Sequence, residues 1–307
     1  MVFEAPQRLV RALAGAPADG APQAAADEAW LGALPALLKE AVDGAGLTVE
    51  RVRVPGGRSS LVVLVTLADG SPAVCKLAPP GAHPERERAA LEHWGGTGAV
   101  RVLAGGPAGG GMLLERLRPD VSVRSLPEAK AMLEAAGVLR RLWVAPPSEH
   151  PFETVTEVTG RQAAALAAGA DAGVEGFDAL VTAALEAREG LVAVPVEERL
   201  LHGTFRQSKA LAGERTPWLA VGPEPVVGDP AYDLARLVRD RVEDLVATAS
   251  GASAARRRVR RLAESLEVDA ERVRGWALFR AVESARRSLA RGQRPQAELL
   301  MEYATWL

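Results

Sequence analysis

The sequence predicts an α+β fold of two lobes, in which a small β-rich lobe precedes a larger helical one. Two observations support this prediction. Residues 48–80 contain alternating and β-branched runs separated by turn residues, as antiparallel strands do. From Glu128 onward, apolar residues recur mostly at helical spacing. Strands followed by helices are typical of an α+β order, and we place the lobes at 1–118 and 119–307.

The first lobe is expected to begin with two amphipathic helices, at 6–14 and 27–44, because apolar residues there recur every three or four positions. A meander of three strands follows, then a helix that ends at Gly95, then two strands around a glycine-rich turn. The predicted strands and helix cover "TVERVRVP", "LVVLVTL", "PAVCKLAPP", "HPERERAALEHWG", "VRVLAGG" and "GMLLERLRP".

The second lobe is expected to be helical, apart from residues 200–228, which are short, apolar and turn-rich. That exception separates two groups of helices. The predicted helices lie at 128–144, 156–169, 174–190, 230–249, 252–266, 269–291 and 294–306.

Composition excludes several classes of protein. Hydrophobic residues make up 48% and charged residues 25%, which is typical of a globular chain, and the net charge of −2 argues against a nucleic-acid partner. No apolar run is long enough to span a bilayer, and the first residues do not form a signal peptide. The single cysteine, Cys75, fits a reducing compartment. We therefore expect a cytoplasmic protein with neither a nucleic-acid nor a membrane partner; composition does not indicate its oligomeric state.

Several motifs occur in a fixed order along the chain. They are "PAVCKLAPPG", "ERAALEHWGGTGAVRVLA", "LLERLRPDVSVRSL", "AGVLRRLW" and "VVGDPAYDLARL". Together they resemble the aminoglycoside phosphotransferase family, within it the branch of streptomycin 6-phosphotransferases and hydroxyurea phosphotransferases. The resemblance covers nearly the whole chain and implies the two-lobed protein-kinase-like fold, with a small lobe that covers ATP and a helical lobe that carries the catalytic loop.

The resemblance also implies roles for individual residues. Lys76 matches the lysine that meets the ATP phosphates, Glu87 matches its helix partner, and Glu115 lies on the strand that enters the adenine-binding hinge. These three residues would form a vestigial nucleotide site. The frame of the catalytic loop is also present, in His202, Gly203, Asp229, Pro230, Tyr232 and Asp233.

The chemical groups of the loop differ from the family pattern. The family writes His-Gly-Asp-Leu-His-x-x-Asn, whereas residues 202–209 read "HGTFRQSK". Thr204 replaces the catalytic Asp, Lys209 replaces a metal-binding Asn, and Gly222 stands where the second metal ligand belongs. A threonine is a poor base, and Mg²⁺ needs oxygen ligands. We expect no metal site, no Mg²⁺ and no obligatory cofactor, and the sequence leaves ATP binding open.

These exchanges lead to three hypotheses. The first is a degenerate, pseudokinase-like pseudoenzyme that has lost ATP-dependent phosphoryl transfer and binds a small molecule or partner in the inter-lobe or C-lobe cleft. The second is a repurposed enzyme of specialised metabolism that catalyses a cyclisation, rearrangement or elimination. Its candidate catalytic residues lie in the degenerate loop 200–229 and are Thr204, Arg206, Lys209 and Glu224. The third is a phosphotransferase that uses displaced carboxylates, from Asp229, Glu224 or Asp120. Whether the chain is an enzyme is left open.

Overall fold

The structure, a computed structural model, describes residues 4–14, 21–104, 111–169 and 173–307. It divides into two compact units. Unit 1 comprises Met1–Pro119 and Gly213–Pro217, and unit 2 comprises the rest of the chain. The segment 213–217 was placed in the second lobe by the sequence but groups with unit 1. The predicted glycine-rich turn at 105–110 lies outside the described residues.

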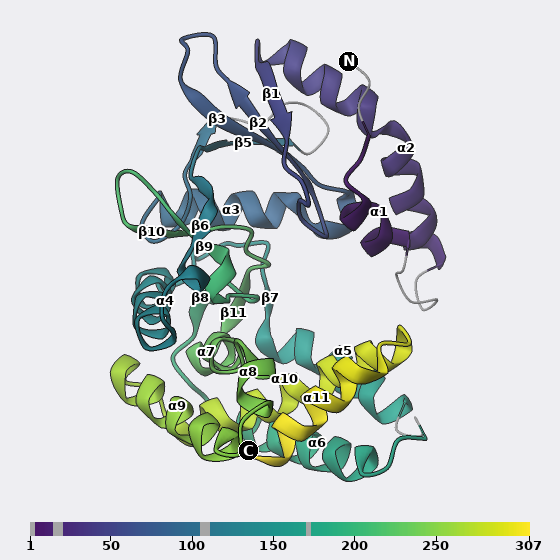
Figure 1. Cartoon of the computed structure of the whole chain (residues 1–307), viewed down its shortest axis with the longest axis vertical. Helices are drawn as coiled ribbons and strands as arrows, with labels where there is room; N and C mark the ends of the chain where they lie inside the picture. The colour runs from purple at the N-terminus through teal and green to yellow at the C-terminus, as the bar shows by residue number, and fades with distance from the viewer. Residues whose placement is uncertain (1–3, 15–20, 105–110, 170–172) are drawn as a thin grey trace. The chain divides into compact units, whose positions relative to one another are not determined.

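Unit 1 is built on a five-stranded antiparallel sheet with the strand order β1-β2-β3-β5-β4. The central strand, β3, pairs Lys76 with Val62 on one side and with Met112 on the other. The elements of this unit are α1 (Gln7–Ala14), α2 (Ala21–Gly44), β1 (Thr48–Val52), β2 (Leu61–Thr66), β3 (Pro72–Leu77), η2 (Pro80–Ala82), α3 (Pro84–Trp94), β4 (Val102–Ala104) and β5 (Gly111–Glu115). They are drawn in purple and blue in Figure 1.

The two faces of this sheet have different roles because side chains alternate along a strand. One face packs against α1 and α2 in a core that includes Leu34 and Leu38 of α2 and Val63 and Cys75 of the sheet. Lys76 follows Cys75 and therefore projects from the opposite face. Burial raises the pKa of the Cys75 thiol to about 11, so this cysteine is a buried core residue. Cys75 therefore lies in the core with α1 and α2, and Lys76 lies on the other face of the sheet.

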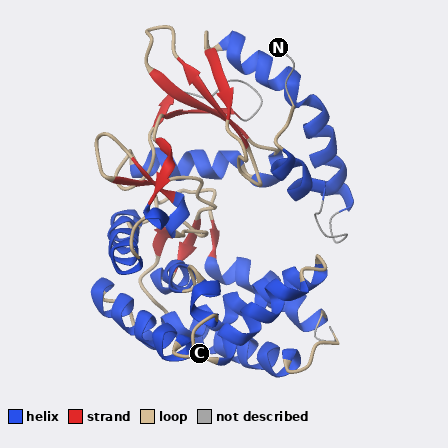
Figure 2. Cartoon of the chain, in the orientation of Figure 1, coloured by secondary structure: helices blue, strands red, loops and turns tan. Residues whose placement is uncertain are grey.

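Unit 2 is mainly helical and also contains two three-stranded sheets, of order β10-β9-β6 and β7-β11-β8. Figure 2 shows these short strands in red among the blue helices. The elements are β6 (Arg118–Ser122), η3 (Val123–Ser125), α4 (Glu128–Leu142), β7 (Glu153–Thr154), α5 (Val155–Ala168), α6 (Phe177–Ala193), β8 (Arg199–Leu201), η4 (Gln207–Lys209), β9 (Ala210–Ala212), β10 (Trp218–Ala220), β11 (Val226–Gly228), α7 (Pro230–Val238), α8 (Val242–Val246), α9 (Gly251–Leu266), α10 (Ala270–Ala290) and α11 (Arg294–Thr305).

Helix α10 is the centre of unit 2. It packs against α5, α6, α7, α9 and α11. Such a position buries a helix on most of its circumference, and Trp276, Phe279 and Val282 are almost inaccessible. The helix predicted over 230–249 is divided into α7 and α8, because Arg241 adopts a left-handed conformation with φ of 56°. Asp233 of α7 and Arg280 of α10 contact the backbone of the loop 202–209.

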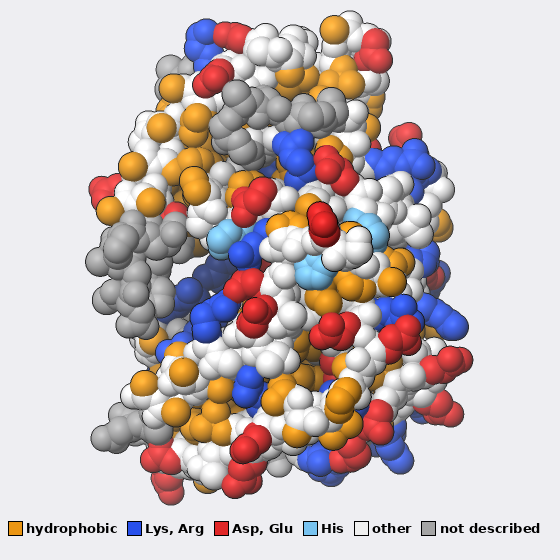
Figure 3. Space-filling model, turned by 180° about the vertical axis from the view of Figure 1, so that it is seen from behind, with side chains coloured by type: hydrophobic (Ala, Val, Ile, Leu, Met, Phe, Trp, Pro, Cys, Tyr) orange, Lys and Arg blue, Asp and Glu red, His pale blue; other side chains and the backbone are white. Residues whose placement is uncertain are grey.

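Two surface findings bear on partners. In the part of the chain that the structure describes, no helix combines the length and apolarity needed to cross a bilayer. On the face seen in Figure 3, acidic and basic side chains are interspersed. A nucleic-acid-binding protein more often presents a continuous basic face.

Candidate active site

Lys76 and Glu87 form a buried ion pair in unit 1. The Lys76 Nζ atom of β3 lies 2.5 Å from Glu87 Oε1 of α3 and also donates to Oε2. Both residues are less than a tenth exposed. Side chains alternate along β3, so Lys76 projects from the face of the sheet opposite α2. A lysine held in this way presents a fixed positive charge, as phosphate binding requires.

Glu115, at the end of β5, has a different role from the other two residues predicted for the nucleotide site. Its carboxylate accepts from the backbone N–H of Arg101 at 2.7 Å and from Arg215 Nη2 at 2.8 Å. Arg215 also donates to the carbonyl of Ala99 at 2.7 Å. The side chain of Glu115 therefore attaches the segment 213–217 to the sheet of unit 1.

The frame of the loop 202–209 is fixed by one buried carboxylate. Asp233, in the first turn of α7, accepts from the backbone N–H groups of His202 and Gly203, both at 2.8 Å. Burial raises the pKa of Asp233, whereas Arg280 and these two N–H groups oppose the rise. The N–H groups of His202 and Gly203, which directly follow strand β8, thus have a charged acceptor inside the protein.

Gly203 and Arg280 hold the same frame from the other side. Gly203 has φ of 78°, and a Cβ atom there would lie 1.9 Å from the carbonyl oxygen of Glu224, so only glycine fits. The buried Arg280 of α10 donates to the carbonyl of Gly203 at 2.8 Å and to that of Tyr232 at 2.9 Å. Its guanidinium also lies 4.0 Å from the centre of the Tyr232 ring. The loop backbone is therefore held in one conformation.

Lys209 brings the exchanged positions together. Its Nζ atom donates to Thr204 Oγ1 at 2.6 Å and to the carbonyl of Gly222 at 2.7 Å. Glu224 Oε1 lies 3.9 Å from the same atom, and its side chain is 66% exposed. The Lys209 ammonium group thus brings together two other residues predicted from the sequence, Thr204 and Glu224.

The residues present do not fit a magnesium ion. Mg²⁺ requires oxygen ligands in octahedral geometry, and here an ammonium group contacts both Thr204 and Gly222. Among the described residues, no group of three or more His, Cys, Asp and Glu is arranged to hold a metal. A positive charge stands where the family pattern has metal ligands.

The remaining candidate carboxylates differ in availability. Asp229 caps α7 through the N–H of Ala231 and accepts from Arg272 Nε and Trp276 Nε1, both at 2.8 Å. It is buried, and these donors make it a structural group. Asp120 lies on β6 and is exposed. Glu224 is exposed and lies 3.9 Å from Lys209 Nζ, so it is the carboxylate of the three best placed for the displaced base that the third hypothesis requires.

Arg206 does not join the group around Lys209. Its guanidinium is partly buried, its Nε atom has no hydrogen-bond partner, and none of its side-chain atoms forms an ion pair within the described residues. The catalytic role that the sequence suggested for Arg206 stays a prediction.

Sequence reasoning missed the contacts from α10. The Nε1 atom of Trp276 donates to Asp229, and Arg280 donates to the carbonyl of Gly203, but neither residue was predicted to contact the loop. A signal was available, because Arg280 follows Trp276 by four positions and so shares its buried face. A charged residue on such a face needs a partner.

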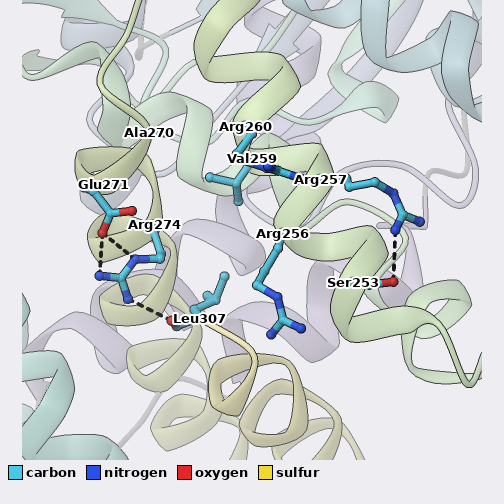
Figure 4. Close-up of a pocket in the computed structure, with 9 residues that line it drawn as sticks. All are labelled: Ser253, Arg256, Arg257, Val259, Arg260, Ala270, Glu271, Arg274 and Leu307. Atoms are coloured by element: carbon cyan, nitrogen blue, oxygen red, sulfur yellow. Dashed lines mark hydrogen bonds and ion pairs between the residues drawn. The ribbon is translucent and has the colours of Figure 1, made fainter.

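The pocket in Figure 4 is separate from all of these residues. It has a volume of about 480 Å³ and lies between α9 and the first turns of α10. Four arginines line it, and Arg274 among them is paired with Glu271. None of the predicted site residues lies in this pocket.

With this geometry established, the chain can be compared with known proteins. The family described as aminoglycoside/hydroxyurea antibiotic resistance kinase matches residues 45–292. The chain belongs to this family. The resemblance inferred from the motifs is therefore confirmed.

Two relatives illustrate the membership. A streptomycin 6-kinase of Streptomyces glaucescens is 35% identical over 266 residues, which cover 84% of each chain. A hydroxyurea phosphotransferase of Kitasatospora aureofaciens is 34% identical over 275 residues, or 85% of this chain and 74% of the relative.

A solved structure shows the fold. An aminoglycoside phosphotransferase, a thermostable mutant in a ternary complex with ADP and hygromycin B, superposes with a TM-score of 0.57 at 17% identity. The match covers 86% of this chain and 95% of that one. The protein-kinase-like α+β fold, with a sheet-containing and a helical lobe, is confirmed.

The relatives correct the first functional hypothesis. Proteins about one third identical to this chain are named as kinases and phosphotransferases, so the prediction of a pseudoenzyme that has lost phosphoryl transfer is wrong. The same finding counts against a repurposed enzyme of a different reaction class. The prediction gave too much weight to three side chains, although phosphoryl transfer depends largely on positioning and charge.

A double-mutant cycle tests the buried pair in unit 1. Replacing Lys76 with Met leaves the Glu87 carboxylate buried without its partner, and we expect the free energy of unfolding to fall by about 3–5 kcal/mol. The double variant Lys76→Met/Glu87→Leu removes both charges and should recover most of that loss. Urea denaturation of the four proteins measures this, and additive effects of the two changes would contradict the account.

The pH dependence of stability tests the state of His202. Burial, followed by Lys209, lowers the pKa of His202 well below its ordinary value of about 6.5. Its Nε2 atom lies 3.2 Å from the carbonyl of Val221, which fits a neutral ring. Because the unfolded chain takes up the proton first, this residue should lower stability as the pH falls below 6.5, by up to about 1.4 kcal/mol per pH unit.

The matched variant is His202→Asn, which keeps a donor for Val221 but does not titrate. Urea denaturation between pH 8 and pH 5 should show the wild-type chain losing stability faster than the variant in acid. Parallel profiles would mean that His202 is not held in the neutral form.

Proposed function

We propose that this chain transfers the terminal phosphoryl group of ATP to a hydroxyl group of a small polar molecule. Family membership supports the reaction class. The observation that carries the proposal is the Lys209 ammonium held by Thr204 and Gly222, because it places a fixed positive charge at the catalytic loop. In phosphoryl transfer, charge and positioning contribute most of the catalysis.

Each unit contributes residues of its own. In unit 1, Lys76 is oriented by Glu87 to bind phosphate oxygens of the nucleotide. In unit 2, Lys209 is the cation for the charge that develops on the transferred group. No step requires a metal in this account, because the groups around Lys209 do not fit Mg²⁺.

The proposed transfer needs one base, which accepts the proton of the acceptor hydroxyl. The acceptor oxygen forms a bond to the γ-phosphorus as the bond from that phosphorus to the β–γ bridging oxygen breaks, and ADP leaves. The proton of the acceptor hydroxyl passes to the carboxylate of Glu224, which is exposed and 3.9 Å from Lys209 Nζ. A weak base suffices in a loose transition state, in which the hydroxyl loses its proton late.

The acceptor is proposed to be a hydroxylated small molecule of the kind that the family phosphorylates. A neighbouring structure holds hygromycin B with ADP, and relatives are named for streptomycin and hydroxyurea. A role in resistance to, or biosynthesis of, an antibiotic is consistent with these names. We propose the cytoplasm, where ATP is available and Cys75 stays reduced.

Assays with ATP test this proposal. The purified full chain should consume ATP and give a monophosphorylated product, detected by mass spectrometry, with at least one member of a panel that includes streptomycin and hydroxyurea. Lys209→Met should lower kcat by roughly 10²-fold, and Glu224→Gln by about 10²–10⁴-fold.

The matched control is Arg261→Met, an exposed arginine of α9, which should retain the wild-type rate. Absence of any product across the panel, at ATP and acceptor concentrations that saturate the relatives, would contradict the proposal. Equal rates in the Lys209→Met and wild-type chains would remove the role assigned to that lysine.

A further inference from the structure

The pocket of Figure 4, which lies within unit 2, gathers four arginines around a volume of about 480 Å³. Arg256, Arg257 and Arg260 come from α9, and Arg274 comes from the second turn of α10. Glu271 is the one acidic side chain among the nine residues that line the pocket. Four positively charged side chains therefore stand against one that is negatively charged.

The acidic side chain of the pocket is already paired. Glu271 Oε2 lies 2.6 Å from Arg274 Nη2, and Arg274 also donates to the carbonyl of Leu307 at 2.8 Å. These contacts hold Arg274 at one wall of the pocket and balance its charge. The charges of the three arginines of α9 are not balanced by any side chain that lines the pocket.

The three arginines of α9 also keep donors for a ligand. Arg256 donates to the carbonyl of Trp306 at 3.2 Å, and Arg257 donates to Ser253 Oγ at 3.0 Å. Within the part of the chain that the structure describes, Arg260 forms neither a hydrogen bond nor an ion pair. All three side chains are exposed, and each guanidinium has five N–H donors, so most of these donors face solvent.

The spacing of these arginines places like charges side by side on α9. Arg260 follows Arg256 by four positions and Arg257 by three, and residues at these spacings are neighbours on a helix surface. Like charges at such spacings destabilise a helix. An anion bound between them reverses the effect, because it replaces repulsion with attraction.

The size and charge of the pocket indicate the class of ligand. A volume of about 480 Å³ is in the range of sites for small molecules. The planar fork of a guanidinium pairs with two oxygens of a phosphate group. Three unbalanced guanidinium groups match a molecule with several phosphate charges, whereas a single carboxylate would balance only one of them.

We propose that Arg256, Arg257 and Arg260 bind a small polyanion with two or more phosphate groups in the pocket between α9 and α10. The phosphate groups belong to an inorganic polyphosphate or to a nucleotide, and both present the same oxygens to the arginines. The pocket contains none of the residues of the candidate active site. The proposal therefore does not depend on the phosphoryl transfer proposed above.

Hydrogen–deuterium exchange of the full chain, read by mass spectrometry, tests this site because it reports where a ligand binds. Inorganic tripolyphosphate and ATP are titrated separately in EDTA, at a constant ionic strength of about 0.15 M. Both should slow exchange in peptides from α9 and the first turns of α10, in a saturable manner. Equal effects would identify the phosphate chain as sufficient, and a stronger effect of ATP would identify a nucleotide as the source.

Two neighbouring arginines provide a matched pair of variants. Arg260 lines the pocket and Arg261 does not, and both are exposed residues of α9. Arg260→Met should weaken the apparent affinity for tripolyphosphate by about tenfold or more, whereas Arg261→Met should keep the wild-type affinity. Arg256→Met/Arg260→Met should abolish the effect in these peptides. Unchanged exchange elsewhere in the chain shows that the variants are folded.

Three results would overturn the proposal. The first is unchanged exchange in α9 and α10 with both probes. The second is an equal loss of affinity in Arg260→Met and Arg261→Met, because the probe would then respond to the net charge of α9 and not to the pocket. The third is slowed exchange confined to β3 or to the loop 202–209, because the phosphate groups would then bind only at the candidate active site.

Discussion

The contact of Asp233 with the backbone of His202 and Gly203 is the constraint on which the candidate site depends. It orients the loop so that the carbonyl of Gly203 accepts a hydrogen bond from Arg280. The carbonyl of Glu224 lies so close to Gly203 that a side chain there would clash with it. Within this frame Lys209 contacts Thr204 and Gly222. The side chains that perform chemistry differ from the family pattern, while the frame that positions them is kept.

This separation explains why an exchanged loop is compatible with phosphoryl transfer. The transition state carries its charge on the oxygens of the transferred group, and the protein stabilises it by placing positive charge in a fixed geometry. In the family pattern a metal supplies that charge, and we propose that Lys209 Nζ supplies it here. An ammonium group has three donors, two of which contact Thr204 and Gly222 in this structure.

The sequence was sufficient for the fold and for the frame, and insufficient for the chemistry. The period-two pattern of β3 separates Cys75 from Lys76, and the motif around Asp229 and Asp233 marks the loop frame. The contacts of Lys209 join residues 5 and 13 positions away through a turn whose geometry no local pattern encodes. The role of the buried Arg280 depends on which helix faces pack together, and so only the three-dimensional structure reveals it.

The most direct test of the central claim, that Lys209 replaces the metal, is the affinity of ATP measured by isothermal titration calorimetry in EDTA and in excess Mg²⁺. The wild-type chain should bind ATP with dissociation constants that agree within about threefold, because its positive charge is supplied by the protein. The variant Lys209→Asn/Gly222→Asp, which restores two metal ligands, should bind only with Mg²⁺. A wild-type chain that binds ATP only when Mg²⁺ is present would contradict the account.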